Sequence, residues 1–229
     1  MLTLLPCVEI DPPASPAGCV IWLHGLGADG NDFVPIVSEL KLNIPLRFVF
    51  PHAPLIPVTI NNGYVMRAWY DIVSMNMNQH ADQVGIDDSV KKLQQLIERE
   101  KQSGIPYERI ILAGFSQGAV IALTTGLTFQ KQLAGIIALS GYLPHSEQVI
   151  KTSNPLYKST PIFIGHGTED PIVPYPLGEK TYQTLKNYNY TISWHSYTMP
   201  HSVCQEEIQD IAKWLTRALE PIKQYRDKF

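Results

Sequence analysis

The chain has 229 residues, of which 45% are hydrophobic and 17% are charged, and its formal net charge is −3. This length and apolar content suffice for one well-filled globular domain, so we predict a single domain over residues 1–229. The slight acidic excess and the scattered positive charges argue against a protein that binds nucleic acid.

The N-terminal sequence and the cysteines indicate the compartment. The stretch "MLTLLPCVEIDPP" has no lysine or arginine and contains acidic residues, so it does not resemble a signal peptide. No apolar run approaches the roughly 20 residues needed to cross a bilayer, so we expect no stable membrane insertion. The three cysteines make no CxxC pair, which favours free thiols over a disulfide framework. We therefore predict a cytoplasmic protein.

Four short apolar runs are expected to form strands buried on both faces of a parallel sheet. Each is rich in Ile, Leu or Val and contains Gly. In chain order they are "CVIWLHG", "RIILAGF", "LAGIIALSG" and "PIFIGHG". A further strand is expected in "TISWHSYTM".

Two segments have helical spacing. Between residues 88 and 103, one face collects Val90, Leu93, Leu96 and Ile97, and Asp87 or Asp88 is expected to cap the start. Residues 208–219 repeat the pattern near the C-terminus. Strands alternating with helices predict an α/β fold with a mostly parallel central sheet and helices on both faces.

The segment between residues 51 and 86 fits neither period. It contains several prolines, the turn-like "NNGY" and irregularly spaced apolar residues. We predict that residues 61–86 form a long irregular loop, and such loops in compact domains are often functional.

The stretch "GFSQG", residues 114–118, matches G-x-S-x-G. It follows the strand-like "RIILA" and precedes "AVIALTTGL", which is apolar on nearly every side and predicts a buried helix. A tight turn from strand to helix crowds the backbone, so small residues are needed beside the serine. A glycine-rich turn that merely contains a serine is the alternative. We predict that Ser116 is a nucleophile at the carboxyl end of the sheet.

A catalytic serine requires a histidine base and an orienting acid, which follow this kind of turn in the order acid, then histidine. His201 in "MPHSV" lies between the last predicted strand and the last helix, which suits a base. Glu169 and Asp170 both follow "PIFIGHG", and Asp170 is preferred because it lies past the strand end and before Pro171. Of the other histidines after Ser116, His195 suits packing within a strand and His166 suits bracing of the loop that follows it, whereas His145 lies in a polar loop without a strong context.

Acyl transfer also needs N–H donors for the developing oxyanion. The backbone N–H of Gln117, directly after the serine, is one candidate. The second is Leu26, between Gly25 and Gly27 in the loop of "CVIWLHGLGADG". His24 in the same loop is expected to pack and hydrogen-bond.

With these motifs in place, the sequence resembles the acyl-protein thioesterase and small carboxylesterase (lysophospholipase-like) family of α/β hydrolases. The similarity runs from "VIWLHGLGADGNDF" to "MPHSVCQEEIQDIAKWL", and its most specific block is "RFVFPHAPLIPVTINNGYVMRAWYDI". The stretch "GHGTEDPIVPYPLG" matches the acid loop of the family. The resemblance implies a Ser116–His201–Asp170 triad with Leu26 and Gln117 as oxyanion donors. Ala119 stands where the family commonly has a second glycine after "GFSQG", and we expect tighter packing there.

The resemblance implies an α/β-hydrolase fold and hydrolysis of carboxylic esters or thioesters of acyl chains through an acyl-enzyme, without metal or organic cofactor. The acyl donors it points to are acylated proteins, lysophospholipids and small esters. A non-catalytic binding protein on the same scaffold is the alternative from another class, and it would not need a complete triad.

The apolar residues of the irregular loop are candidates for binding the acyl chain. Methionine is an adaptable lining for hydrocarbon, and three methionines fall between residues 66 and 77. We hypothesise that part of residues 60–77 forms a channel or flap beside Ser116, and we predict as substrate-binding residues Met66, Trp69, Ile72 and Met75. Burial in the core is the alternative, in particular for Trp69.

Overall fold

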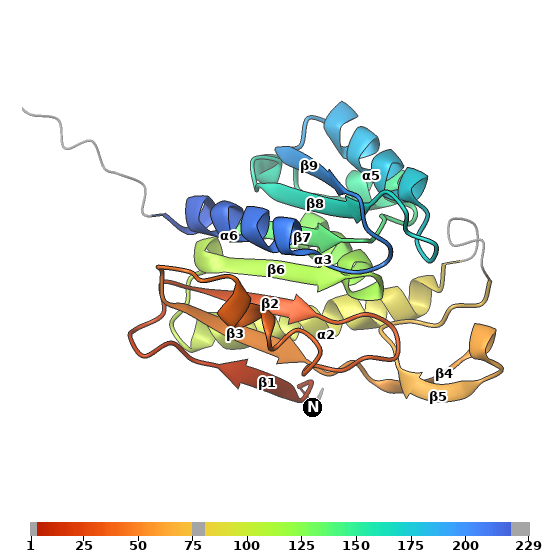
Figure 1. Ribbon diagram of the computed structural model, residues 1–229, viewed down its shortest axis with the longest axis horizontal. Helices are drawn as coiled ribbons and strands as arrows, with labels where there is room; N and C mark the ends of the chain where they lie inside the picture. The colour runs from red at the N-terminus through yellow and green to blue at the C-terminus, as the bar shows by residue number, and fades with distance from the viewer. Residues whose placement is uncertain (1–3, 75–80, 221–229) are drawn as a thin grey trace, which may run out of the picture.

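The computed structural model describes residues 4–74 and 81–220. Within these residues, a central sheet of seven strands has the order β1-β3-β2-β6-β7-β8-β9 (Figure 1). β1 pairs with β3 in antiparallel fashion, and all other neighbouring pairs are parallel. The strands are β1 (Cys7–Ile10), β2 (Gly18–Leu23), β3 (Leu46–Pro51), β6 (Ile110–Phe115), β7 (Gly135–Leu139), β8 (Ile162–Gly167) and β9 (Ile192–Tyr197). The predicted mostly parallel sheet is confirmed.

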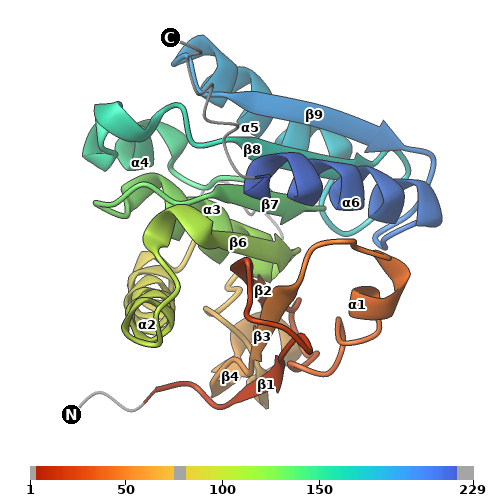
Figure 2. The same ribbon diagram turned by 90° about the vertical axis from the view of Figure 1, so that its left-hand side faces the viewer.

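Helices cover both faces of this sheet, as predicted (Figure 2). They are α1 (Ile36–Glu39), α2 (Gln83–Gln102), α3 (Gln117–Thr128), α4 (Ser146–Thr152), α5 (Tyr175–Asn187) and α6 (Gln205–Leu219). Side chains of β2 alternate between the faces: Ile21 and Leu23 belong to the cluster with α2 and α3, whereas Trp22 belongs to the cluster with α1 and α6. None of the described helices is long and apolar enough to span a bilayer.

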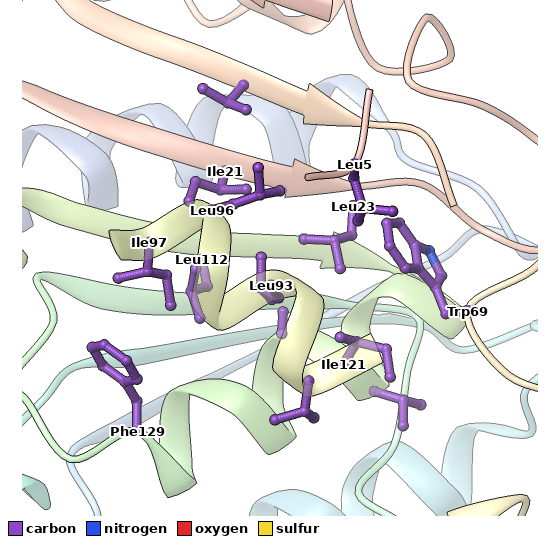
Figure 3. Packing of buried hydrophobic residues seen from close by; sticks show 14 of the residues in the cluster. Leu5, Ile21, Leu23, Trp69, Leu93, Leu96, Ile97, Leu112, Ile121 and Phe129 are labelled. Atoms are coloured by element: carbon purple, nitrogen blue, oxygen red, sulfur yellow. The ribbon is translucent and has the colours of Figure 1, made fainter. Parts of the chain in front are cut away.

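The core between α2 and the sheet is filled by aliphatic side chains (Figure 3). Leu93, Leu96 and Ile97 of α2 are fully buried and point toward β2 and β6. Trp69 lies at one end of this cluster and is 2% exposed. The predicted apolar face of residues 88–103 is therefore the face that packs on the sheet.

The start of α2 differs from the prediction. The helix begins at Gln83, and its N-cap is Asp82, whose Oδ1 accepts a hydrogen bond from the N–H of Gly85 at 3.0 Å. Asp87 and Asp88 lie inside the helix. The apolar periodicity did not reach the first turn, because its residues include the exposed Val84 and the glycine at 85.

Part of the segment predicted as an irregular loop is also regular. β4 (Leu55–Val58) and β5 (Tyr64–Arg67) form an antiparallel hairpin. Between them, a short 3₁₀ turn over Thr59–Asn61 precedes Asn62 and Gly63, which both have positive φ, so the turn chemistry of "NNGY" is used here. The four-residue strands are too short to give a visible alternation, and only their mutual pairing defines them.

Candidate active site

The turn at Ser116 joins β6 directly to α3. Ser116 has φ 55° and ψ −118°, outside the regions that side-chain-bearing residues usually occupy. Its N–H donates to the carbonyl of Leu139 at 2.9 Å, which fixes the turn against the end of β7. The serine lies at the carboxyl end of the sheet and beside the N-terminus of α3, where the partial positive charge of the helix dipole favours a developing anion.

The two flanking glycines are required by close backbone contacts. A Cβ at Gly114 would lie 2.2 Å from the carbonyl oxygen of Gly118. A Cβ at Gly118 would lie 2.5 Å from that of Leu23 and 2.6 Å from that of His24. The sequence "GFSQG" therefore has glycine where β6, α3 and the end of β2 leave no room for a side chain.

Ala119 packs tightly, as expected for an alanine in this helix. It is fully buried, and a Cβ at Gly141 would lie 2.4 Å from its methyl carbon. Gly141 thus leaves the space that the Ala119 side chain occupies.

Asp170 and His201 come together from two loops at this same edge. The Nδ1–H of His201 donates to Asp170 Oδ2 at 2.7 Å. Asp170 Oδ1 accepts from the N–H groups of Ile172 and Val173 at 2.8 and 2.9 Å. The Asp170 carboxylate is fully buried, whereas 15% of the His201 side chain is exposed. The neighbouring Glu169 is exposed.

The two loops are also joined through their backbones. The N–H of Thr168 donates to the carbonyl of Tyr197 at 2.8 Å, and that of Glu169 to the carbonyl of Met199 at 3.2 Å. A Cβ at Gly167 would lie 2.3 Å from the Met199 carbonyl oxygen, so only glycine permits this approach. The acid and the histidine are therefore held on one rigid pair of loops.

The histidine loop reaches the serine turn through Phe115. The ring of His201 lies 4.7 Å, between centroids, from the ring of Phe115, the residue before Ser116. On the other side, a Cβ at Gly25 would lie 3.4 Å from the Cβ of Ser116. The loop after β2, the serine turn and the histidine loop thus converge at the carboxyl end of the sheet.

A narrow pocket of about 70 Å³ opens beside Ser116. This is below the roughly 300–1,000 Å³ of pockets that enclose drug-sized ligands, so a long acyl chain would extend beyond it. Three of the predicted site residues line it: Leu26, Gln117 and Ile72. The remaining lining residues come from several segments of the chain and have no local signal in the sequence: Tyr70, Asp71, Ser74, Ala81, Tyr142, Ile172 and Val173.

Two of the predicted substrate-binding residues, Met66 and Trp69, do not line this pocket. Met66 is half-buried on β5, with its sulfur 3.7 Å from where a Cβ of Gly27 would lie. Trp69 is placed in the core instead of the pocket wall, because its indole packs in the cluster between α2 and the sheet. Met75 is outside the described residues.

His24, His166 and His195 have hydrogen-bond or packing partners, whereas His145 is exposed. His24 is buried: its Nδ1–H donates to the carbonyl of Gly25 at 2.7 Å, and its Nε2 accepts from the N–H of Ala53 at 3.1 Å. Burial lowers the pKa of His24 to about 4, so the ring is neutral. His166 donates from Nε2 to the Val173 carbonyl at 2.9 Å and so braces the acid loop. His195 stacks on Phe163 with centroids 4.3 Å apart. Within residues 4–74 and 81–220, no cluster of three His, Cys, Asp or Glu side chains is suited to hold a metal ion.

A second buried carboxyl belongs to Glu207 on the first turn of α6. Its two oxygens are buried and have no hydrogen-bond partner among the described residues. It packs on β8, where a Cβ at Gly165 would lie 2.0 Å from Glu207 Oε1. Burial first, and then repulsion from Asp210, raise the pKa of the Glu207 carboxyl to about 8.

We expect Glu207→Gln to stabilise the protein at alkaline pH. Because the folded-state pKa of about 8 exceeds the ordinary 4.5, the folded state retains a proton that the unfolded chain loses. The stability that this neutral acid contributes is complete below pH 4.5 and is lost as pH rises to about 8. The amide never ionises, so the variant should gain several degrees in Tm over wild type near pH 8.5 and almost none near pH 4.5.

Thermal unfolding across this pH range measures the effect, and Glu206→Gln, a change at the exposed neighbouring position, is the matched control. Parallel Tm profiles for wild type and Glu207→Gln would contradict the assignment of a raised pKa.

Known proteins resemble this chain over nearly its whole length. The sequence profile of the phospholipase/carboxylesterase family matches residues 5–219. An acyl-protein thioesterase 1 of Cryptococcus neoformans is 36% identical, with 96% of this chain and 100% of that protein covered. An acyl-protein thioesterase 1 of Candida albicans is 40% identical, with 90% of this chain and 94% of that protein covered.

Solved structures agree in fold. Arabidopsis thaliana SOBER1 superposes with a TM-score of 0.84 at 32% identity, covering 89% of this chain and 99% of that one. The acyl-protein thioesterase 2 of Zea mays gives a TM-score of 0.83 at 27% identity, covering 93% of this chain and 99% of that one.

Proposed function

We propose that Ser116, His201 and Asp170 are the catalytic triad of this chain, which belongs to the phospholipase/carboxylesterase family of α/β hydrolases. It is a carboxylesterase- or thioesterase-like serine hydrolase. The observation that carries the proposal is the 2.7 Å hydrogen bond between His201 and the buried Asp170, at the sheet edge where the strained turn presents Ser116. A glycine-flanked serine in this backbone conformation, next to an acid–histidine pair, supports the role of an activated nucleophile.

In the proposed acylation step, the Ser116 hydroxyl attacks the carbonyl carbon of the ester or thioester. His201 takes the hydroxyl proton on Nε2, because its Nδ1 carries the proton donated to Asp170. Asp170 holds this tautomer and stabilises the imidazolium that forms. Its burial and its two backbone hydrogen bonds keep the carboxylate in a single orientation.

The tetrahedral intermediate carries a negative oxygen, for which we propose the backbone N–H groups of Leu26 and Gln117 as donors. Both residues line the pocket at Ser116, and Gln117 is the first residue of α3. Donors fixed before the reaction stabilise charge that develops only in the transition state.

Collapse of the intermediate releases the alcohol or thiol, which receives the proton from His201, and leaves the acyl group on Ser116. A water molecule then attacks the acyl carbonyl with His201 as base, and the carboxylic acid leaves with Ser116 restored.

For substrates we propose acyl esters and thioesters, including acylated proteins or lysophospholipids. Two relatives at 36% and 40% identity are named acyl-protein thioesterases, which supports thioesters of proteins. We further propose that the protein acts in the cytoplasm, which is consistent with its three free cysteines.

We expect activity to rise with acyl-chain length and then level off. Each methylene that enters the apolar pocket contributes up to about 0.8 kcal/mol, or about fourfold in kcat/KM, until the chain leaves the pocket. The measurement is a series of p-nitrophenyl esters and matching acyl thioesters, kept below their micelle concentrations. Ile72→Ser on the pocket wall should flatten the series, and Met66→Ser should do so if β5 borders the chain.

Val65→Ser is the matched control, because Val65 neighbours Met66 but is 56% exposed. A flat series in wild type, or an unchanged slope in both Ile72→Ser and Met66→Ser, would contradict the acyl-binding role of this segment. Absence of turnover on every ester and thioester would contradict the proposed substrates.

A further inference from the structure

Trp69 connects two parts of the candidate site through hydrogen bonds. Its backbone N–H donates to the side-chain Oε1 of Gln117 at 2.9 Å. Its indole Nε1–H donates to the backbone carbonyl of His24 at 2.8 Å. Its own carbonyl accepts from the hydroxyl of Ser89 on α2. Trp69 therefore contacts the loop after β2, the start of α3 and α2 at once.

The loop after β2 is tied to this same segment at a second point. The N–H of Gly27 donates to the carbonyl of Arg67 at 2.9 Å. Leu26 lies between the two attachment points, His24 and Gly27. Its backbone is therefore positioned by the stretch from Arg67 to Trp69.

The Gln117 side chain is likewise attached twice. Besides accepting from Trp69, it donates from Nε2 to the carbonyl of Tyr70 at 2.7 Å. This amide is 3% exposed, so water does not compete for these bonds. The start of α3, which carries the N–H of Gln117, is therefore held on the same stretch of chain as the Leu26 loop.

We propose that Trp69 is a positioning residue that sets the separation of the two oxyanion donors, the N–H groups of Leu26 and Gln117. The proposal rests on the proposed function, because it requires those two groups to bind the oxyanion. Core packing alone would require no hydrogen bond from the indole Nε1 to the loop that carries Leu26, so this bond points to a role beyond packing.

The effect of such a residue falls on the transition state. Donors must lie about 2.7–3.1 Å from the oxyanion, which exists only after the nucleophile has attacked. A displacement of the Leu26 loop should therefore lower kcat and leave KM for a short ester nearly unchanged. Substitution of a residue that only stabilises the fold would lower Tm without lowering kcat selectively over KM.

The test is Trp69→Phe, which removes the indole N–H but keeps an aromatic ring and both backbone hydrogen bonds. We expect kcat for p-nitrophenyl acetate to fall about tenfold, less than the roughly 10²–10³-fold loss of an entire donor, with KM within about twofold. The matched control is Trp22→Phe, since Trp22 is 1% exposed and its Nε1 has no hydrogen-bond partner among the described residues. It should lose similar Tm but keep kcat within about twofold of wild type.

Gln117→Met removes the hydrogen bonds that join the Gln117 side chain to the backbone of Trp69 and Tyr70. It provides a second variant if Trp69→Phe folds poorly. Both single variants should lower kcat. The fold-loss of kcat in the double variant should be smaller than the product of the two single losses, because either change alone already uncouples Trp69 from one of the two donors. Independent, multiplicative losses would overturn the proposal, as would equal kcat losses in Trp69→Phe and Trp22→Phe.

Labelling by a fluorophosphonate probe separates this proposal from the proposed function. If the probe reacts at Ser116 in all variants and the kcat pattern is absent, the positioning role alone is wrong. If the probe does not react at Ser116 in wild type, the proposed function fails and the positioning role fails with it.

Discussion

Replacing Ser116 with alanine is expected to lower kcat/KM for acyl esters by about 10⁴-fold or more, to the level left by binding and oxyanion stabilisation. The methyl group cannot form the acyl-enzyme, and the positive φ of this position is strained for alanine as it is for serine. A fluorophosphonate probe should label wild type at one site, located by peptide mass spectrometry, and should not label Ser116→Ala.

Ser140→Ala is the matched control for this change. Ser140 also follows a central strand, has φ 46° and is fully buried. Its hydroxyl has no hydrogen-bond partner among the described residues. Its loss should leave labelling and turnover intact. Labelling at another serine, or undiminished turnover by Ser116→Ala, would rule out Ser116 as the nucleophile.

We expect Asp170→Asn to lower kcat by about 10⁴-fold, close to the loss from His201→Ala. The physical reason is the orientation of the side chain. Oδ1 of Asp170 accepts two backbone N–H groups, so the asparagine oxygen must remain there. The amide –NH₂ then faces His201 Nδ1 and stabilises the tautomer protonated on Nε2, which cannot accept the proton of Ser116.

The measurement is turnover of p-nitrophenyl acetate, with circular dichroism to verify the fold. Glu169→Gln is the control, because Glu169 is adjacent but exposed. If Glu169→Gln were damaging and Asp170→Asn harmless, the acid would have been assigned wrongly.

The sequence predicts most reliably the parts of this protein that are buried on both sides. β2, β6, β7 and β8 are continuous apolar runs because helices cover both faces of them. The edge strand β1 and the helix α5 were not predicted. β1 is half-exposed, and α5 contains Pro176 and Gly178, which weaken its helical pattern.

The candidate triad could be proposed from the sequence because its serine, acid and histidine follow a fixed order along the chain. The contacts that build its surroundings could not, because they join distant segments. The Gln117 side chain accepts a hydrogen bond from the backbone N–H of Trp69, which lies 48 positions earlier, and no local sequence pattern predicts such a bond. For Trp69 the sequence alone leaves open both a substrate contact and burial in the core, and the structure places it in the core with both N–H groups hydrogen-bonded to other segments.

The contact between Ala119 and Gly141 constrains how this sequence can change. A side chain at position 141 would meet the Ala119 methyl at 2.4 Å, so only one of the two positions can carry a Cβ. With glycine at position 119 this contact is absent, and the nearest remaining atom to a Cβ at position 141 is the carbonyl oxygen of Ser116, at 3.2 Å. The two positions are therefore epistatic: the same substitution at 141 is more harmful beside alanine at 119 than beside glycine, so the order in which mutations arise affects which are accessible.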